Sequence, residues 1–497
     1  MPERPDGRRA GSLLLLLAAA AAVAHRLFLA AATDFPINDG GLFYAFVNAT
    51  AASFPALPTT VAFNGLVIPF AYPPLSFWFG ALLTRLGADP LAVVHLLPIA
   101  MNAVYVLLFA LVLRKSGRSP LFAALALLFF CTVLRSFEWL VMGGGLSRGA
   151  GSLFLMLTLL AVRVPMPGRR EPLAYWRWVA AGAAVAGAIL SHLEWGIDAA
   201  ACVVLARAIS SRSFANFVAS TTTAGATALL LILPWLAFVY QAHGLAPLFA
   251  AGGTSPWGIV SFKGHLLWLG SSSLANPLVP LGLVLLLLRR DFFWPLFLLI
   301  CIALTPRHAP TPAVLALAVF AATGAVWLFE QAAVWVRPRW IGAAVTTLLI
   351  LLLASLQLNR RFLADGPALH PLSPAVRHAM RWVAERHPGD SFLVLTSAPW
   401  WYDRSAEWFP VLARARSVNT LQGREWLPDK AYARWYARDI ALKTSGNCAA
   451  LLNRMRAYEP PHYYWVEWRR GCFLPADFAP VFRNAEVTIF ERRTEAD

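Results

Sequence analysis

The stretch FPINDGGLFY, residues 35–44, contains an aspartate whose setting suits chemistry. Asp39 follows Asn38 and precedes two glycines, which let the backbone turn tightly and leave room for a large ligand beside the carboxylate. A carboxylate beside a hydroxyl group can act as a general base. The alternative is structural: Asp39 could be the N-cap of a helix that begins in LFYAFV.

Other acids and bases are spread over several later loops. Asp34 is a second carboxylate, five residues before Asp39, and could be an ordinary loop charge. The remaining candidates are Glu138, Arg135 and Arg148, then His192 and Glu194, then His243, Lys263 and His265, and finally Arg307 and His308. Each alone is typical of a helix end or a membrane interface. Together they could stabilise charge on a leaving phosphate. Asp39 with Glu138 or Glu194 could also hold a divalent cation, although no ligand spacing here is diagnostic.

The composition indicates which elements position these residues. The chain has 497 residues, of which 58% are hydrophobic and 14% charged, whereas soluble domains carry about 25% charged residues. The sequence therefore predicts an α-helical polytopic membrane protein rather than a large soluble enzyme. Eleven apolar runs are long enough to cross a bilayer, namely 11–32, 91–113, 119–136, 149–164, 178–193, 195–210, 216–240, 265–288, 291–305, 312–329 and 340–357.

The basic residues set the expected orientation. With the N-terminus in the cytoplasm, the inside segments hold sixteen Lys and Arg residues, and the outside loops before residue 358 hold five. The basic charge therefore faces the cytoplasm and anionic lipid headgroups, and no nucleic-acid partner is needed to explain the net charge of +16. Residues 1–24 also resemble a signal peptide, but an uncleaved first span is favoured, and cleavage would not change the later topology.

Two segments are predicted to lie outside the membrane. The first, 33–90, contains two apolar pieces, 41–52 and 74–86, which are too short to cross and suit helices at the membrane surface. The second, 358–497, is large enough to form an extracytoplasmic domain, which leaves 1–357 as the transmembrane domain. The two cysteines of segment 358–497, Cys448 and Cys472, are expected to form a disulfide in an oxidising compartment.

The pattern in residues 358–497 favours a small α/β domain. Helices are predicted at 374–387, near 405–415 and across 426–457, and strands at 391–397, 416–421, 462–468 and 486–493.

At this point the residues carry a family resemblance. FPINDGG in the first loop, followed by Tyr72-Pro73-Pro74-Leu75, resembles the membrane-embedded C-type glycosyltransferases, and protein O-mannosyltransferases and lipid A aminoarabinose transferases are similar in outline. More closely, the chain resembles uncharacterised bacterial polytopic membrane proteins with an NDGG first loop. The matching pieces are Asn38 to Tyr44, Gly143 to Arg148, and Trp408-Phe409-Pro410.

The resemblance implies a function and residue roles. Such enzymes move a sugar from a polyprenyl-phosphate carrier to an acceptor hydroxyl or amine at the outer face of the membrane, with inversion at the anomeric centre. Asp39 would be the catalytic base, and Arg307, with His308, would hold the donor phosphate, with Arg148 as a weaker candidate. The expected location is a bacterial cytoplasmic membrane. A single acid follows Asn38, where the better-known patterns have an adjacent acidic pair, which puts a metal-dependent mechanism in doubt.

Two further points stay open. Trp400-Trp401-Tyr402-Asp403 is similar to the acceptor motif Trp-Trp-Asp-Tyr-Gly of oligosaccharyltransferases, so Trp400 and Trp401 could stack on a sugar, but packing of the rings at an interface is the stronger interpretation. The alternatives to an enzyme are a transporter or flippase of lipid-linked sugars, although no matched halves are visible, and a non-catalytic membrane scaffold.

Overall fold

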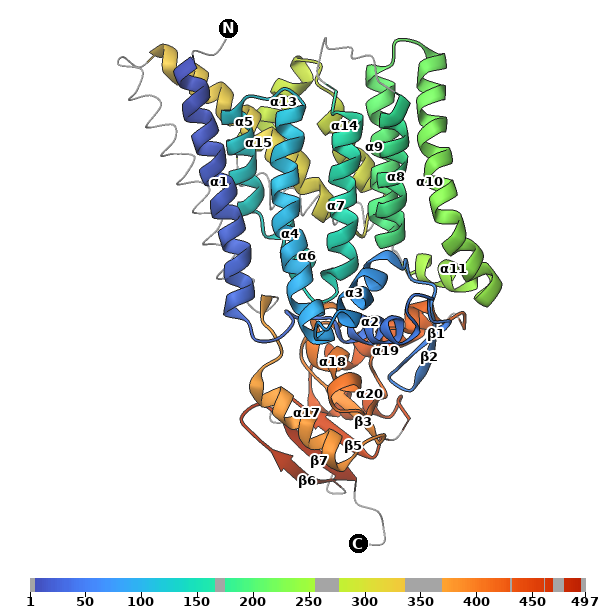
Figure 1. The fold of residues 1–497 in the computed structure, drawn as a ribbon. Helices are drawn as coiled ribbons and strands as arrows, with labels where there is room; N and C mark the ends of the chain where they lie inside the picture. The colour runs from blue at the N-terminus through green and yellow to red at the C-terminus, as the bar shows by residue number, and fades with distance from the viewer. Residues whose placement is uncertain are drawn as a thin grey trace.

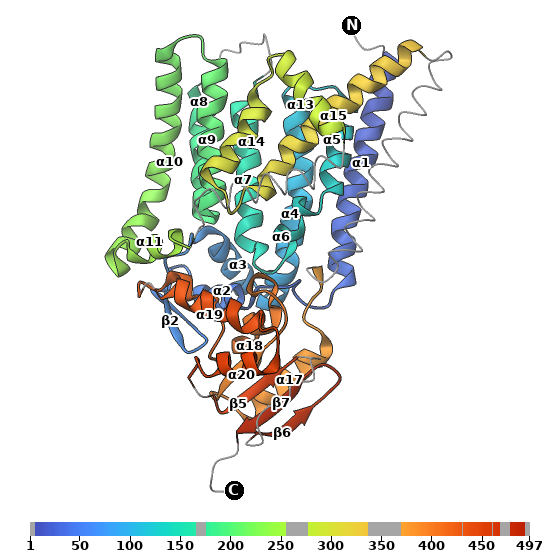
Figure 2. The same cartoon turned by 180° about the vertical axis from the view of Figure 1, so that it is seen from behind.

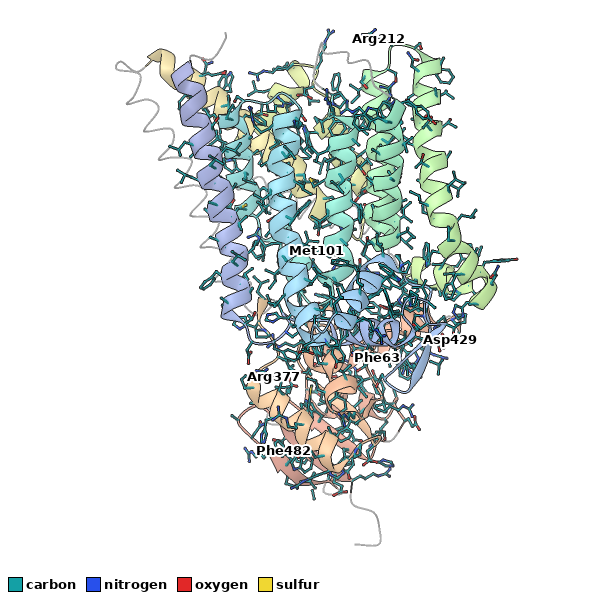
Figure 3. All side chains as sticks on the ribbon, in the orientation of Figure 1. Phe63, Met101, Arg212, Arg377, Asp429 and Phe482 are labelled. Carbon is teal, nitrogen blue, oxygen red and sulfur yellow. The ribbon has the colours of Figure 1, made fainter. Side chains whose placement is uncertain are left out.

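The computed structural model describes residues 5–165, 175–254, 277–335, 369–429, 431–459, 461–467 and 478–492. Its first part is a helical bundle and its second a mixed α/β domain that lies against one end of the bundle (Figure 1). The N-terminus lies at the opposite end of the bundle from this domain. Arg212 lies near the N-terminal end, whereas Arg377 and Asp429 lie toward the other (Figure 3).

Within the described residues, five helices are long and apolar enough to cross a membrane, and a bent pair raises the number to six. The five are α1 (Pro5–Ala32), α4 (Pro90–Lys115), α7 (Gly145–Val162), α10 (Phe214–His243) and α15 (Pro310–Trp335). Shorter helices complete the bundle, namely α5 (Pro120–Thr132), α8 (Tyr175–Ser191), α9 (Leu193–Ser210), α13 (Leu278–Leu288) and α14 (Phe293–Leu304). α15 crosses the bundle obliquely and packs against α13 and α5 (Figure 2).

The multi-pass character predicted from composition is confirmed, but the predicted number of spans is not reached in the described part of the chain. The predicted break at 191–194 is present, because α8 ends at Ser191 and α9 begins at Leu193. The predicted run 340–357, part of the run 265–288 and the domain boundary at 357 lie outside the described residues.

The predicted span at 119–136 is broken in the structure. α5 ends at Thr132, and the chain bends by 100° into residues 134–141, which form a 3-10 turn (Leu134–Ser136) and the short helix α6 (Glu138–Val141). The helix ends because Val133 adopts an extended conformation, with φ −91° and ψ 118°. This bend places α6 against α7.

The first outer segment has both predicted helices, as α2 (Gly41–Ser53) and α3 (Leu75–Arg85). Between them lies a hairpin, β1 (Thr60–Phe63) and β2 (Leu66–Pro69), which the sequence analysis missed. Asn64 and Gly65 form its turn with φ values of 54° and 71°, the conformation for which an Asn-Gly pair is the usual signal. In the figure, α2 and α3 lie between the bundle and the C-terminal domain (Figure 1).

The C-terminal domain contains a five-stranded sheet in the order β4-β3-β5-β7-β6. β3 (Ser391–Leu395) pairs in parallel with β4 (Arg416–Ser417) and β5 (Tyr463–Val466), while β7 (Thr488–Arg492) is antiparallel to β5 and to β6 (Phe478–Arg483). The helices are α17 (Pro374–Arg386), α18 (Arg404–Leu412), α19 (Tyr432–Lys443) and α20 (Cys448–Met455). The mixed α/β prediction is confirmed, and among the described strands of this domain β6 was missed.

Candidate active site

Asp39 lies where the first outer segment meets the beginning of α7. Its Oδ1 accepts a hydrogen bond from the backbone N–H of Gly144 at 2.7 Å, and its Oδ2 lies 3.1 Å from the Nη2 of Arg148. Gly144 is the N-cap position of α7, and the N-terminus of a helix stabilises a negative charge. The Asp39 side chain remains 14% exposed, so the carboxylate is held in place without being sealed off.

The structural alternative, in which Asp39 caps the helix that begins in LFYAFV, is wrong. The N-cap position of α2 is Gly40, which offers no side chain, and Asp39 makes its backbone contact with α7 instead. One carboxylate oxygen is therefore bonded to a backbone amide, and the other faces a guanidinium group.

The glycines on both sides of this contact bring two backbones together. A Cβ atom on Gly143 would lie 2.1 Å from the carbonyl oxygen of Asp39, and one on Gly144 would lie 2.5 Å from the Oδ2 of Asp39. Gly40 has a φ of 130° and packs against the Cα of Gly143, while a Cβ on Gly41 would lie 2.4 Å from the carbonyl oxygen of Glu407. The sequence analysis expected the glycines of the first loop to leave room for a ligand, but protein backbone occupies this space.

Arg148 is fixed by contacts beyond Asp39. Its Nε donates to the carbonyl oxygen of Trp139 at 2.9 Å, and its guanidinium carbon lies 5.0 Å from the centre of the Trp139 ring, within the range of a cation–π interaction. The arginine that the sequence suggested as a weaker phosphate ligand is therefore the direct partner of the candidate base.

Arg307 and Arg148 act on the same neighbouring groups. Burial raises the pKa of Tyr72, whose hydroxyl lies 3.2 Å from the Oγ of Ser147, and the positive charges of Arg148 and Arg307 both oppose this shift. Burial also raises the pKa of Glu425, and the Arg307 charge again opposes it. The two guanidinium groups thus border one region between the first outer segment, the bundle and the C-terminal domain.

His308 lies in the turn between α14 and α15, beside this region. Burial lowers its pKa to about 3, and the charges of Arg148 and Arg307 contribute to the decrease, so the imidazole is neutral. The ring centres of His308 and His192 are 5.6 Å apart, and Trp195 meets His308 edge-on at 4.4 Å. The structure therefore brings together Arg148, Arg307, His192 and His308 from separate parts of the chain.

Asp198, on α9, was missed by the sequence analysis. Its side chain is fully buried, its Oδ1 accepts a hydrogen bond from Thr305 at 3.0 Å, and its Oδ2 lies 4.0 Å from the Nε2 of His308. A carboxyl group within an apolar span is costly and commonly marks a functional site. Its position inside the predicted run 195–210 was the available signal.

Other candidates are engaged in contacts that join the two domains. Asp34 is paired with Arg377 of α17 at 2.5 Å, and Glu138 accepts a hydrogen bond from the hydroxyl of Tyr402 at 2.5 Å. Asn38 is buried, and its carbonyl oxygen accepts from the Nε1 of Trp408 at 3.0 Å. These three residues hold the first segments and the C-terminal domain together, rather than facing Asp39 as a group.

The remaining predicted residues lie in other elements. Glu194 lies in the first turn of α9, close in sequence to His192. Trp400 and Trp401 meet edge-on with ring centres 6.2 Å apart, and Trp401 is 40% exposed. Cys448 is disulfide-bonded, whereas its predicted partner Cys472 lies outside the described residues. In the described part of the chain, no three His, Cys, Asp or Glu side chains gather as ligands for a cation.

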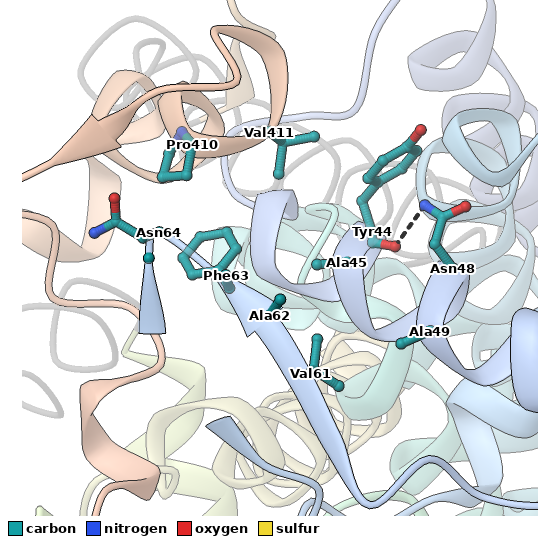
Figure 4. A pocket seen from close by; sticks show the side chains of 11 residues that line it. Tyr44, Ala45, Asn48, Ala49, Val61, Ala62, Phe63, Asn64, Pro410 and Val411 are labelled. Carbon is teal, nitrogen blue, oxygen red and sulfur yellow. Dashed lines mark hydrogen bonds between the residues drawn. The ribbon is translucent and has the colours of Figure 1, made fainter. Parts of the chain in front are cut away.

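A groove of about 550 Å³ lies between α2, the β1–β2 hairpin and α18 (Figure 4). Its lining residues include Tyr44, Asn48, Phe63, Asn64 and Pro410. None of its lining residues is charged, so the groove suits a neutral ligand better than a phosphate. Neither Asp39 nor the two tryptophans line it.

The fold matches solved structures, although no protein-family model matches the chain and no curated protein matches its sequence. The apo oligosaccharyltransferase of Archaeoglobus fulgidus matches with a TM-score of 0.59 at 15% identity, over 92% of this chain and 69% of that one. Apo ArnT from Cupriavidus metallidurans gives a TM-score of 0.54 at 15% identity, over 95% of this chain and 97% of that one. The mycobacterial arabinofuranosyltransferase AftD gives 0.51 at 15% identity, over 96% of this chain and 41% of that one.

Two of these proteins have also been solved with a polyprenyl phosphate. The archaeal enzyme, AglB, was solved with an inhibitory peptide and a dolichol-phosphate, and ArnT was solved with undecaprenyl phosphate. At such low identity the similarity concerns the fold, and it does not test the narrower resemblance to bacterial proteins with an NDGG loop. The chain therefore shares its fold with this oligosaccharyltransferase, with ArnT and with AftD.

Proposed function

We propose that this chain is an inverting glycosyltransferase of a bacterial cytoplasmic membrane. It moves a sugar from a polyprenyl-phosphate carrier to an acceptor hydroxyl or amine at the outer face. The observation that carries the proposal is the Asp39 carboxylate, which is fixed by Gly144 and Arg148 yet still 14% exposed. The shared fold supports the choice of donor, because two proteins with this fold were solved with polyprenyl phosphates.

In the proposed reaction, Asp39 accepts the proton of the acceptor as the acceptor atom attacks the anomeric carbon of the sugar. A bond forms between the acceptor atom and this carbon, and the bond from the carbon to the phosphate oxygen breaks. Its electron pair stays on the phosphate, so polyprenyl phosphate leaves with one more negative charge. Attack from the side opposite the leaving phosphate inverts the anomeric centre.

Arg307 is the proposed partner of the departing phosphate. It is exposed, and its hydrogen bond from Nη1 to the hydroxyl of Thr254 is long, at 3.3 Å, so the guanidinium group has donors to offer. Arginine matches a phosphate in both charge and geometry. The neutral His308 can add an N–H donor, whereas Arg148 is committed to Asp39 and holds the base in place.

The test compares Asp39→Asn with Asp34→Asn. The amide that replaces the Asp39 carboxylate can still accept the Gly144 hydrogen bond but cannot take up a proton, so transfer should fall about 100- to 10,000-fold. Asp34 is a carboxylate of the same segment that pairs with Arg377 on the surface, and its replacement should leave transfer near the wild-type rate. Transfer is measured with purified protein, and polyprenyl-phospho-sugars are quantified by mass spectrometry in a deletion strain carrying each variant.

The accumulating lipid would identify the sugar together with the class of reaction. Accumulation in the deletion strain and in the Asp39→Asn strain, but not in the Asp34→Asn strain, supports the proposal. Wild-type transfer by well-folded Asp39→Asn protein would overturn the assignment of the base. Movement of a lipid-linked sugar across proteoliposomes that survives Asp39→Asn would favour the transporter alternative.

A further inference from the structure

Glu407, on α18 of the C-terminal domain, reaches across to the segment that carries Asp39. Its side chain is buried, and its Oε1 accepts a hydrogen bond from the backbone N–H of Gly40 at 3.0 Å. The backbone N–H of Leu42 also acts on this carboxyl group. Both amides belong to the start of α2, where the cap residue Gly40 has no side chain to satisfy them. Glu407 therefore caps α2 from a position 367 residues further along the chain.

The hydrogen bond to Gly40 fixes the peptide unit that directly follows Asp39. On the other side of Asp39, the carbonyl oxygen of Asn38 accepts from the indole N–H of Trp408 at 3.0 Å. Close backbone packing supports both contacts, because Gly41 has no space for a Cβ beside the carbonyl group of Glu407. The two adjacent residues of α18 thus hold Asp39 from both sides, through the backbone that flanks it.

The Glu407 carboxyl group is held in its neutral form at pH 7. Burial raises its pKa to about 8, the negative charge of Asp39 adds to the increase, and the backbone amides and Arg148 oppose it. Ionisation would place a second negative charge beside Asp39 inside a buried junction. Because the pKa is raised from the ordinary 4.5, the folded state loses stability relative to the unfolded state as the pH rises from about 4.5 to about 8. The loss is complete above that pH.

The charged side chains that act on Glu407 are Asp39 and Arg148. α2 contains no charged residue. Arg377 of α17 is paired with Asp34, and Arg416 of β4 is paired with Glu459. Asp39 and Arg148 are therefore the charges that govern the ionisation of Glu407.

We propose that Glu407 is a positioning residue that fixes the Asp39–Gly40 peptide, and that its ionisation, which adds a second negative charge beside Asp39, sets the alkaline limit of sugar transfer. The proposal rests on the proposed function for its second half only. Its first half concerns the order of the start of α2 and can be measured without a substrate.

The first experiment measures hydrogen exchange of the amides in residues 40–46 by mass spectrometry at pH 7, in full-length protein. Glu407→Ala removes the cap, and exchange should become about 5- to 30-fold faster. Glu407→Gln keeps an amide oxygen at the same place and should stay within about threefold of wild type. Glu467→Gln is the matched control, because Glu467 is another carboxyl group of this domain whose pKa burial raises, to about 7. It should leave residues 40–46 unchanged.

The second experiment measures the ratio of the transfer rates at pH 9 and pH 7. The wild type and Glu467→Gln should show a ratio of about 0.1 to 0.2, because roughly a tenth of a group with a pKa near 8 stays protonated at pH 9. Glu407→Gln cannot ionise at this position, so its transfer rates at pH 9 and pH 7 should be nearly equal. This readout separates an electrostatic role from a purely structural one.

The two experiments test the two halves of the proposal separately. Unchanged exchange in Glu407→Ala would overturn the positioning role, and the same alkaline decline in Glu407→Gln as in wild type would overturn the pH limit. Absence of transfer by the wild-type protein would contradict the proposed function instead, while the exchange experiment would still decide whether Glu407 orders the start of α2.

Discussion

At the scale of single residues, the proposed reaction depends on the pair formed by Asp39 and Arg148. Both side chains are partly exposed, at 14% and 18%, and an ion pair of this kind contributes only about 1 kcal/mol to stability. The ion pair therefore contributes little to folding, and its main effect is to orient the Asp39 carboxylate. Arg148 is held by Trp139, and it keeps the second carboxylate oxygen turned toward a positively charged region. Arg307 supplies the other charge of that region and is exposed.

We predict that Arg307→Ala weakens donor binding more than it slows the chemical step. The loss of a charged hydrogen bond to phosphate should raise the KM for the polyprenyl-phospho-sugar roughly 10- to 100-fold. Arg307→Lys should recover part of this affinity, because the charge stays but the paired donors are lost. Steady-state kinetics with varied donor concentrations will measure both. Arg212→Ala, at the opposite end of the bundle, is the control, and an unchanged KM in Arg307→Ala would exclude the assigned role.

At the scale of elements, the start of α7 is built around close backbone contact. The carbonyl oxygen of Ile37 accepts a hydrogen bond from the N–H of Gly143 at 3.0 Å, so residues 37–40 run directly beside the GGGL stretch. Cβ atoms at Gly143 and Gly144 would overlap Asp39. The consecutive glycines therefore serve the approach of two backbones, and this approach sets the carboxylate at the N-terminus of α7.

We predict that Gly143→Ala damages both stability and transfer. Its Cβ would lie 2.1 Å from the backbone oxygen of Asp39, and relief of such an overlap should cost about 1–3 kcal/mol. Gly225, in the middle of α10, is the matched control because a Cβ there meets nothing within 4 Å. Gly225→Ala should be neutral or stabilise by up to about 1 kcal/mol. Thermal unfolding in detergent and the transfer assay measure the two effects, and equal behaviour of both variants would contradict this role for the glycine.

At the scale of the whole molecule, the C-terminal domain forms part of the proposed active site. Asn64 of the hairpin exchanges two hydrogen bonds with the backbone of Ser417, at 2.7 Å and 2.8 Å. Glu138 and Asn38 bind Tyr402 and Trp408 of the same domain. Contacts from three separate segments therefore fix this domain against the end of the bundle where Asp39 lies. The groove next to α18 lies at the same junction, and none of its lining residues is charged.

We predict that this junction faces the outside of the cell. Arg212 and Asp429 are exposed and lie toward opposite ends of the molecule (Figure 3). In intact spheroplasts, a membrane-impermeant maleimide should label Asp429→Cys, whereas Arg212→Cys should react only after the membrane is opened. The described free cysteines, Cys131, Cys202 and Cys301, lie in the bundle, and the wild-type protein measures their background. The reverse labelling pattern would contradict the orientation inferred from the basic residues.

The sequence alone determined the features that depend on local pattern. Apolar runs of sufficient length indicate membrane helices, and their periodicity or brevity located α2, α3, the break between α8 and α9, and most of the C-terminal domain. The bend after Thr132 was missed because the run stays largely apolar through it, and only the backbone of Val133 turns the chain. Asp39 stood out because an acid beside two glycines just after a span is unusual.

The tertiary structure decided what Asp39 touches. In the sequence, a single acid directly follows Asn38, whereas the fold places Glu407 from a distant helix beside it. No local pattern could show this, because hydrogen bonds and charge interactions depend on distance in space, and 367 residues separate Glu407 from Gly40. For the same reason, the sequence could not show that Arg148, predicted as a phosphate ligand, pairs with Asp39, or that Asp198 lies close to His308. Sequence supplied the candidate groups, and packing of the C-terminal domain against the first segment determined the orientation of Asp39 and raised the pKa of Glu407.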